Sequence, residues 1–186
     1  MKKTWLTLAA ALLAGSCAQR PPDEAQQRFS EAILALSRAR TEMDRFYALD
    51  YAEKEAFNTG RKEAAWSFAE EHARLLPRYK GNWNYGNAVQ DVNIVFGRIA
   101  LSEGRVEDAK KFLLKAGDTP GSPQLKSFGP NMTLARELLE KGERRAVVEY
   151  FGKCSRFWKM HQGKLDEWTR QAEAGEIPDF GANLIY

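Results

Sequence analysis

Apolar side chains recur every three or four residues along most of the chain, which is the spacing of amphipathic helices. Between residues 25 and 47 they outline one face of a first helix through Phe29, Ile33, Leu36, Met43 and Tyr47. The same periodicity predicts six further helices, most of them bounded by glycine or proline, near residues 64–76, 88–99, 106–116, 130–139, 146–158 and 165–172. No segment alternates in the manner of a β-strand, so the pattern predicts an all-α protein of about seven helices.

Glycine marks three similar breaks in this pattern. Gly60, Gly104 and Gly142 lie 44 and 38 residues apart, and each follows one apolar helix and opens the next. Glycine permits a tight turn between two helices, and a small residue after it lets them approach closely. An alanine follows each glycine after four or five residues: Ala65, Ala109 and Ala146. Repeats of this length indicate stacked helical hairpins.

Three segments resemble tetratricopeptide-type repeats: IALSEGRVEDAKKFLLKA, LARELLEKGERRAVVEYFGKC and FNTGRKEAAWSFAEE. The resemblance covers residues 45 to 157 and implies stacked antiparallel hairpins around a concave groove that binds proteins or peptides. The repeat length is irregular and the consensus tryptophan and tyrosine are not in place, so the repeats are degenerate. An irregular helical bundle is the alternative. Residues 122–186 also resemble bacterial proteins of no assigned function, which implies no activity.

The N-terminal segment has the three-part layout of a secretory signal peptide. Lys2 and Lys3 precede an apolar run over residues 5–13, which is too short to span a bilayer, and small residues follow it. The sequence Ala14-Gly15-Ser16-Cys17 resembles the bacterial lipobox, although Ala14 stands where leucine is usual. The resemblance implies a lipid on Cys17 and a membrane-anchored protein that faces the periplasm or the exterior. An ordinary signal peptide with an incidental cysteine is the alternative.

These features predict the order of segments along the chain. A signal peptide (1–16) precedes the lipidated cysteine and a tether (17–24). A helical-repeat domain (25–176) follows, and an irregular tail (177–186) packs on its body. Cys154 then remains as a lone thiol, which we expect to be buried among aromatic side chains. The formal net charge is +3 and falls to about +1 without the two N-terminal lysines, so we expect no nucleic-acid partner.

Residues with catalytic chemistry form no motif. His72 and His161 lie far apart, and neither belongs to a spacing that binds metal. No GxSxG turn is present, and Leu125 replaces the glycine that a phosphate-binding loop needs before Lys126. We therefore expect no enzyme, metal ion or cofactor. The glycine- and proline-rich stretch over residues 117–132 is interpreted as a joint between helices, although it is longer than such joints usually are.

The predicted function is that of an exported scaffold that holds a protein or peptide partner at the cell envelope. Partner contacts are expected from polar residues on or just before the third predicted helix: Asn84, Asn87, Gln90, Asp91, Asn93 and Arg98. The alternatives are a small-ligand-binding helical protein, an enzyme of unknown reaction, or a purely structural role in envelope assembly. A deep pocket with converging polar groups would favour a small ligand, and an open groove would favour the scaffold.

Overall fold

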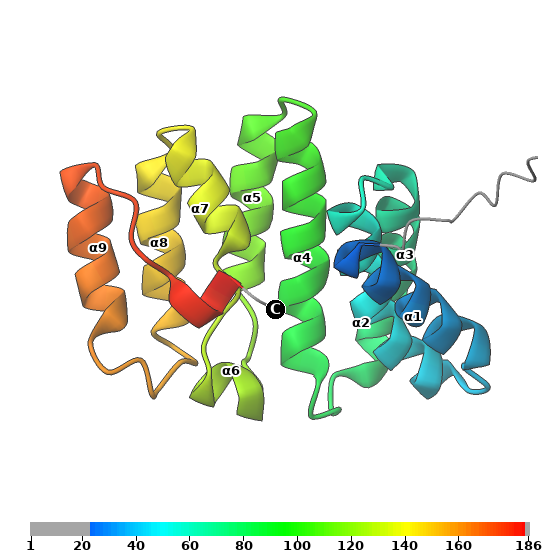
Figure 1. Ribbon diagram of the computed structural model, residues 1–186. Helices are drawn as coiled ribbons and strands as arrows, with labels where there is room; N and C mark the ends of the chain where they lie inside the picture. The colour runs from blue at the N-terminus through cyan, green and yellow to red at the C-terminus, as the bar shows by residue number, and fades with distance from the viewer. Residues whose placement is uncertain (1–22, 185–186) are drawn as a thin grey trace, which may run out of the picture.

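The computed structural model describes residues 23–184, and this part of the chain is helical without any β-strand (Figure 1). The all-α prediction is thereby confirmed, but nine α-helices and two 3₁₀ turns stand where about seven helices were expected. They are α1 (Glu24–Arg38), α2 (Glu42–Asn58), α3 (Lys62–Leu75), η1 (Leu76–Tyr79), α4 (Tyr85–Ser102), α5 (Val106–Gly117), α6 (Pro123–Ser127), α7 (Thr133–Glu140), α8 (Arg144–Cys154), α9 (Lys164–Ala174) and η2 (Gly181–Leu184).

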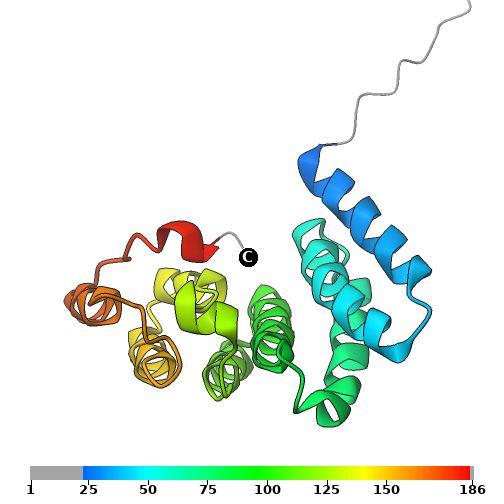
Figure 2. The same cartoon turned by 90° about the horizontal axis from the view of Figure 1, so that it is seen from below.

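The helices follow one another along a curved row (Figure 2). Each of α1 to α4 packs on the next, α4 packs on α5, α5 on α8, and α8 on α9. The short α7 contacts α4, α5 and α8, and α6 lies against α4. The element that ends the described chain, η2, lies across the side of the row that α7 occupies (Figures 1 and 2). This curvature brings α1 and α2 to one side of a groove and α4 and α6 to the other, while α2 and α4 also contact each other.

The first predicted helix is two helices. Helix α1 ends at Arg38, and Thr41 caps α2, with its hydroxyl accepting from the Asp44 N–H at 3.0 Å while the Asp44 carboxylate accepts from the Thr41 N–H at 3.0 Å. The apolar spacing continues across the break between α1 and α2, so periodicity alone predicts one continuous helix there. Thr-x-x-Asp, a form of capping box, marks the boundary.

The three glycine breaks adopt the same turn. Their φ angles are +77° at Gly60, +77° at Gly104 and +83° at Gly142. In each, the N–H of the following residue donates to the carbonyl five positions earlier: Arg61 to Ala56 at 2.8 Å, Arg105 to Ala100 at 2.9 Å and Glu143 to Leu138 at 3.0 Å. The residue five positions after each glycine is fully buried, and these are Ala65, Ala109 and Val147. Val147 rather than the predicted Ala146 therefore fills the third position.

The segment over residues 117–132 is ordered and docked on α4. It contains α6, whose N-cap Ser122 accepts from the Leu125 N–H at 3.0 Å. The Thr119 hydroxyl donates to the Gly86 carbonyl at 2.7 Å, and a Cβ on Gly86 would lie 1.9 Å from the Gly121 carbonyl oxygen. The excess length of this joint therefore forms a short helix that packs on the start of α4.

The C-terminal tail closes against this segment. The Asn183 carbonyl accepts from the Met132 N–H at 2.8 Å, and its side-chain amide donates to the carbonyls of Phe128 at 3.1 Å and Pro130 at 2.9 Å. Phe180 is buried in the largest apolar core, which also holds Cys154, so the expectation of a buried thiol is confirmed. The predicted signal peptide and Cys17 lie outside the described residues, as do residues 185–186.

Candidate functional site

A groove of about 930 Å³ lies between the two arms of the curved row. One wall comes from α1 and α2, and the other comes from α4, α6 and the tail at Leu184. This volume is within the range of ligand-binding clefts in proteins. Polar and charged side chains supply much of its surface: Arg28, Glu31, Asp50, Lys54, Glu55, Asn58, Asn84, Asn87, Gln90, Asp91 and Gln124. We call this space the groove.

Aromatic side chains stand exposed along the groove. Tyr51 is 63% exposed, Trp83 56% and Phe128 65%. Tyr47, from the same wall as Tyr51, stacks on Trp83 with ring centroids 6.0 Å apart, and its hydroxyl accepts from the Asn82 side chain at 2.8 Å. Large exposed aromatic surfaces gathered in one concave place are typical of interaction sites.

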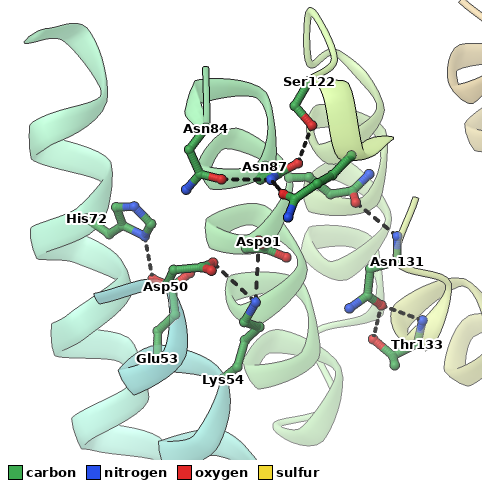
Figure 3. Close-up of polar contacts among 12 residues, drawn as sticks. Asp50, Glu53, Lys54, His72, Asn84, Asn87, Asp91, Ser122, Asn131 and Thr133 are labelled. Carbon is green, nitrogen blue, oxygen red and sulfur yellow. Dashed lines mark hydrogen bonds and ion pairs between the residues drawn. The ribbon is translucent and has the colours of Figure 1, made fainter. Parts of the chain in front are cut away.

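Three charged side chains form the floor of the groove where α2 meets α4 (Figure 3). The Lys54 ammonium lies 3.2 Å from Asp50 Oδ1, one helical turn earlier, and 3.5 Å from Asp91 Oδ2 on α4. Asp50 and Asp91 are also joined by a side-chain hydrogen bond. The side chains are only 13% (Asp50), 16% (Lys54) and 9% (Asp91) exposed, so this triad ties the two helices together at the groove surface.

A second charged pair lies behind the floor, fully buried between α2 and α3. His72 Nδ1 lies 3.1 Å from Glu53 Oε2, and the imidazole meets the Phe46 ring edge to face at 5.0 Å (Figure 3). Glu53 Oε1 and His72 Nε2 find no hydrogen-bond partner among residues 23–184. Together with the triad, this pair makes five ionisable groups in one place, which we call the charge cluster: Asp50, Glu53, Lys54, His72 and Asp91.

Burial and mutual attraction set the protonation of the triad. Burial raises the pKa of Asp91 well above its usual value, and the attraction of Lys54 only partly opposes this. Burial acts in the same direction on Asp50, but Lys54 and the hydrogen bond from Asp91 outweigh it, so the pKa of Asp50 is lowered. Burial opposes the charge of Lys54, yet the surrounding carboxylates raise its pKa. Burial and the neighbouring charges therefore favour an ionised Asp50 and a charged Lys54, and they favour the protonated form of Asp91.

The buried pair shares a proton in a similar way. Burial raises the pKa of Glu53, and His72 offsets only part of that rise. Burial disfavours the imidazolium of His72, but the attraction of Glu53 outweighs it and the pKa of His72 is raised. Taking such groups out of water is costly, and perturbed pKa values cluster at functional sites more often than elsewhere. The charge cluster is therefore part of the candidate site.

Four of the six predicted contact residues line the groove: Asn84, Asn87, Gln90 and Asp91. Each of these four side chains also contacts another side chain or backbone group of the protein, Asp91 through Lys54 (Figure 3). The Asn87 amide donates to Asn84 Oδ1 at 2.7 Å and to Gln124, and its oxygen accepts from the Ser122 hydroxyl at 2.5 Å. These bonds hold α6 against α4 along the groove wall.

The Gln90 side chain makes a similar internal link. Its oxygen accepts from the Asn131 N–H at 2.9 Å, and its amide donates to the Tyr150 hydroxyl at 3.3 Å. The Tyr150 hydroxyl in turn donates to the Asn131 carbonyl at 2.9 Å. Gln90 thus fixes the 117–132 segment to the wall of the groove.

The other two predicted residues lie away from the groove. Asn93 donates to the Val89 carbonyl of its own helix at 2.7 Å. Arg98 lies over the Phe57 ring at 4.4 Å and pairs with Glu137 at 2.8 Å, beside a separate depression of about 320 Å³. The missed site residues are the triad partners Asp50 and Lys54 and the exposed aromatics. An Asp-x-x-x-Lys spacing on a helix looks like a surface ion pair, so the sequence carries no sign of their burial.

Two further features bear on the candidate site. Within residues 23–184 no group of three or more His, Cys, Asp and Glu side chains is placed to hold a metal ion. None of the helices in the same residues combines the length and the apolar character that crossing a bilayer requires.

Comparison of the chain with protein-family models, with curated proteins and with solved structures returned no match in any of the three. The functional argument therefore depends on the groove and the charge cluster.

Proposed function

We propose that the protein is an exported, lipid-anchored scaffold whose groove holds a segment of a partner protein at the bacterial cell envelope. The observation that carries this proposal is the gathering of exposed Tyr51, Trp83 and Phe128 along one concave surface. Such side chains supply large contact areas at low entropic cost when a partner covers them. The internal bonds of Asn87 and Gln90 support it further, because they keep the groove wall preformed.

We also propose that the fold is a degenerate tetratricopeptide-like array of antiparallel hairpins. The pairs α2–α3, α4–α5 and α7–α8 each pack together across a glycine turn of the same geometry. Each turn brings a fully buried residue of the second helix to the same position. These recurrences support three related units, with α6 as an insertion between the second and third.

The anchor is proposed from the N-terminal sequence. Asp23 caps α1 by accepting from the Gln26 N–H at 2.8 Å. Five residues, 18–22, lie between Cys17 and Asp23, so a chain from residue 17 to residue 23 spans at most about 20 Å. A lipid on Cys17 would therefore hold the groove close to the membrane surface.

Site-directed photo-crosslinking in the native envelope tests the proposal. Benzoylphenylalanine replaces Trp83 in the groove, or Met160, which is exposed to the same 56% but does not line the groove. We expect a discrete crosslinked protein from position 83 and none from position 160. Adducts of equal yield at both positions, or none at either, would contradict partner binding in the groove.

A small ligand is the second candidate, and the charged floor favours it. The groove has the volume of a ligand pocket, and Asp50, Lys54 and Asp91 present polar atoms at its base. Native mass spectrometry of the extracted protein distinguishes the two candidates. A bound small molecule, together with no crosslink at position 83, would favour the ligand-binding function.

A further inference from the structure

We propose that the partner segment places a lysine or arginine side chain in the groove, with its cationic head toward Asp50 and Asp91 and its aliphatic stem against the aromatic side chains. The inference rests on the proposed function and specifies the chemistry of the partner. It is carried by the charges that line the groove, by the engagement of the groove's own cations, and by the position of the aromatic rings.

Carboxyl groups outnumber cations along the groove. Four line it, at Glu31, Asp50, Glu55 and Asp91, against the two cations Arg28 and Lys54. A concave surface with excess acidic groups attracts cationic ligands and strengthens the field within it.

The groove's own cations are already engaged. Arg28 on α1 pairs with Glu55 at 3.4 Å and with Glu24 at 3.8 Å. Lys54 divides its single charge between two aspartates. Glu31 in contrast meets a neutral partner, since its carboxylate accepts from the Gln27 amide at 2.9 Å. Among the described residues, Glu31 is therefore the carboxylate of the lining that has no ion pair, and acidic groups outnumber cations along the groove.

The aromatic rings supply the second half of the complementarity. Tyr51 already attracts a cation, because the Lys54 ammonium lies 5.4 Å from its ring centroid. Tyr51 lies on α2, whereas Trp83 stands before α4 and Phe128 follows α6, so aromatic surface borders the groove from both arms. Rings attract cations through their faces, and they also cover the methylene stem of a lysine or arginine side chain.

Binding of a cation would draw a proton from the floor. Burial favours the protonated form of Asp91, and the groups that face it are Asp50, Glu53 and Lys54 on α2 and Tyr150 on α8, with His72 on α3 behind them. A second cation favours the ionised form of Asp91, so its proton is released to solvent on binding. Affinity should therefore rise with pH until Asp91 is ionised in the free protein as well.

Peptide binding to the full-length protein in detergent tests the inference. The probes are three fluorescein-labelled nonapeptides, Gly-Ser-Ala-Ala-X-Ala-Ala-Ser-Gly, in which X is lysine, norleucine or glutamate. Norleucine keeps the aliphatic stem and removes the charge. We expect the lysine peptide to bind about tenfold more tightly than the norleucine peptide, with the glutamate peptide weakest. The lysine preference should grow as the pH rises.

Matched variants locate the preference in the groove. Asp91→Asn should remove most of the lysine preference and leave norleucine binding unchanged, because the amide cannot ionise. Glu31→Gln, at an exposed position, should reduce the lysine preference by about twofold. This variant replaces Asp91→Asn as the test if Asp91→Asn fails to fold. Glu149→Gln, exposed on α8 and outside the groove lining, should change nothing.

Three outcomes would overturn the inference. Equal affinity for the lysine and norleucine peptides would assign the groove to apolar segments, and preference for glutamate would reverse the charge argument. Leu184 lies at the groove edge, so binding of the norleucine peptide only after residues 185–186 are deleted would make those two residues the occupant. If crosslinking at position 83 still succeeds in these cases, the proposed function stands and only its basic specificity fails.

Discussion

The Lys54 side chain links α2 to α4 at the floor of the groove. Its ammonium pairs with both Asp50 and Asp91, and the buried His72 is the other positive group that acts on Asp50. Removing one member of a buried ion-paired cluster leaves the remaining charges without a partner. The resulting loss of stability is far larger than the net stability that the intact cluster contributes. The loss of Lys54 should therefore differ sharply from the loss of Asp91, because burial favours the protonated form of Asp91.

Replacement of Lys54 by methionine should lower the free energy of unfolding by about 3 kcal/mol. Asp91→Asn should lower it by less than about 1 kcal/mol, because asparagine can still donate a hydrogen bond to Asp50. Urea denaturation at pH 7 measures both. If the two variants lose equal stability, Asp91 is ionised in the folded protein and our assignment of the proton is wrong.

The charge cluster also predicts how stability depends on pH. The folded pKa of His72 is raised, so its contribution to stability is complete below its ordinary value of 6.5 and is lost as the pH rises through the folded value. The raised pKa values of Glu53 and Asp91 act in the same direction, because the folded state binds their protons more tightly.

The urea midpoint should therefore fall as the pH rises from 6 to 9, and His72→Gln should flatten this dependence. Asp50 has a lowered pKa, so its contribution is lost only below about pH 4 and does not enter this window. A wild-type midpoint that rises with pH would show that His72 is buried without its proton. His161→Gln is the control, since that imidazole lies outside the charge cluster.

At the scale of elements, close contact between backbones fixes the 117–132 segment on α4. Gly86 lies at the start of α4, and a side chain there would meet the Gly121 carbonyl rather than a movable side chain. The neighbouring bond from Thr119 to the Gly86 carbonyl shows that the contact is tight on both sides. This packing positions α6 and therefore one wall of the groove.

Gly86→Ala should lower the free energy of unfolding by about 2 to 3 kcal/mol and displace the segment, because overpacking against backbone cannot relax locally. The matched control is Gly152→Ala on α8, where a Cβ meets nothing within 4 Å. The control should gain up to about 1 kcal/mol from helix propensity. Thermal unfolding and hydrogen exchange of residues 117–132 measure the effects, and equal stability of the two variants would contradict the role given to Gly86.

The elements that sequence could predict are those set by local chemistry. The glycine turns and the Asp23 cap follow from residues within a few positions, and the structure contains them. Helix α6 was missed because Ser122 and Pro123 start a helix of only five residues, too short for a periodic signal. The groove could be predicted only in part, since the burial of Lys54 depends on α2 meeting α4, a contact far along the chain.

At the scale of the whole molecule, the proposed anchor has a direct test. Cys17→Ala should abolish incorporation of palmitate in a bacterial host and release the protein from the membrane fraction. Cys154→Ala should keep both the palmitate label and the association with the membrane fraction, because the Cys154 thiol is buried in the core. Labelling that survives the Cys17→Ala change would refute the proposal of a lipid on Cys17. Loss of labelling in the Cys154→Ala variant would instead indicate that Cys154 carries the lipid.

The bonds that Asn183 makes have a consequence for the order of folding. Until this residue has emerged into the compartment where the chain folds, the Met132 N–H and the carbonyls of Phe128 and Pro130 lack the partners that seal the wall beside them. The helices up to α5 can pack before then, but the wall at α6 waits for Asn183, which follows α9 in the chain. A truncated or stalled chain would thus keep most of its helices and still present no finished binding surface.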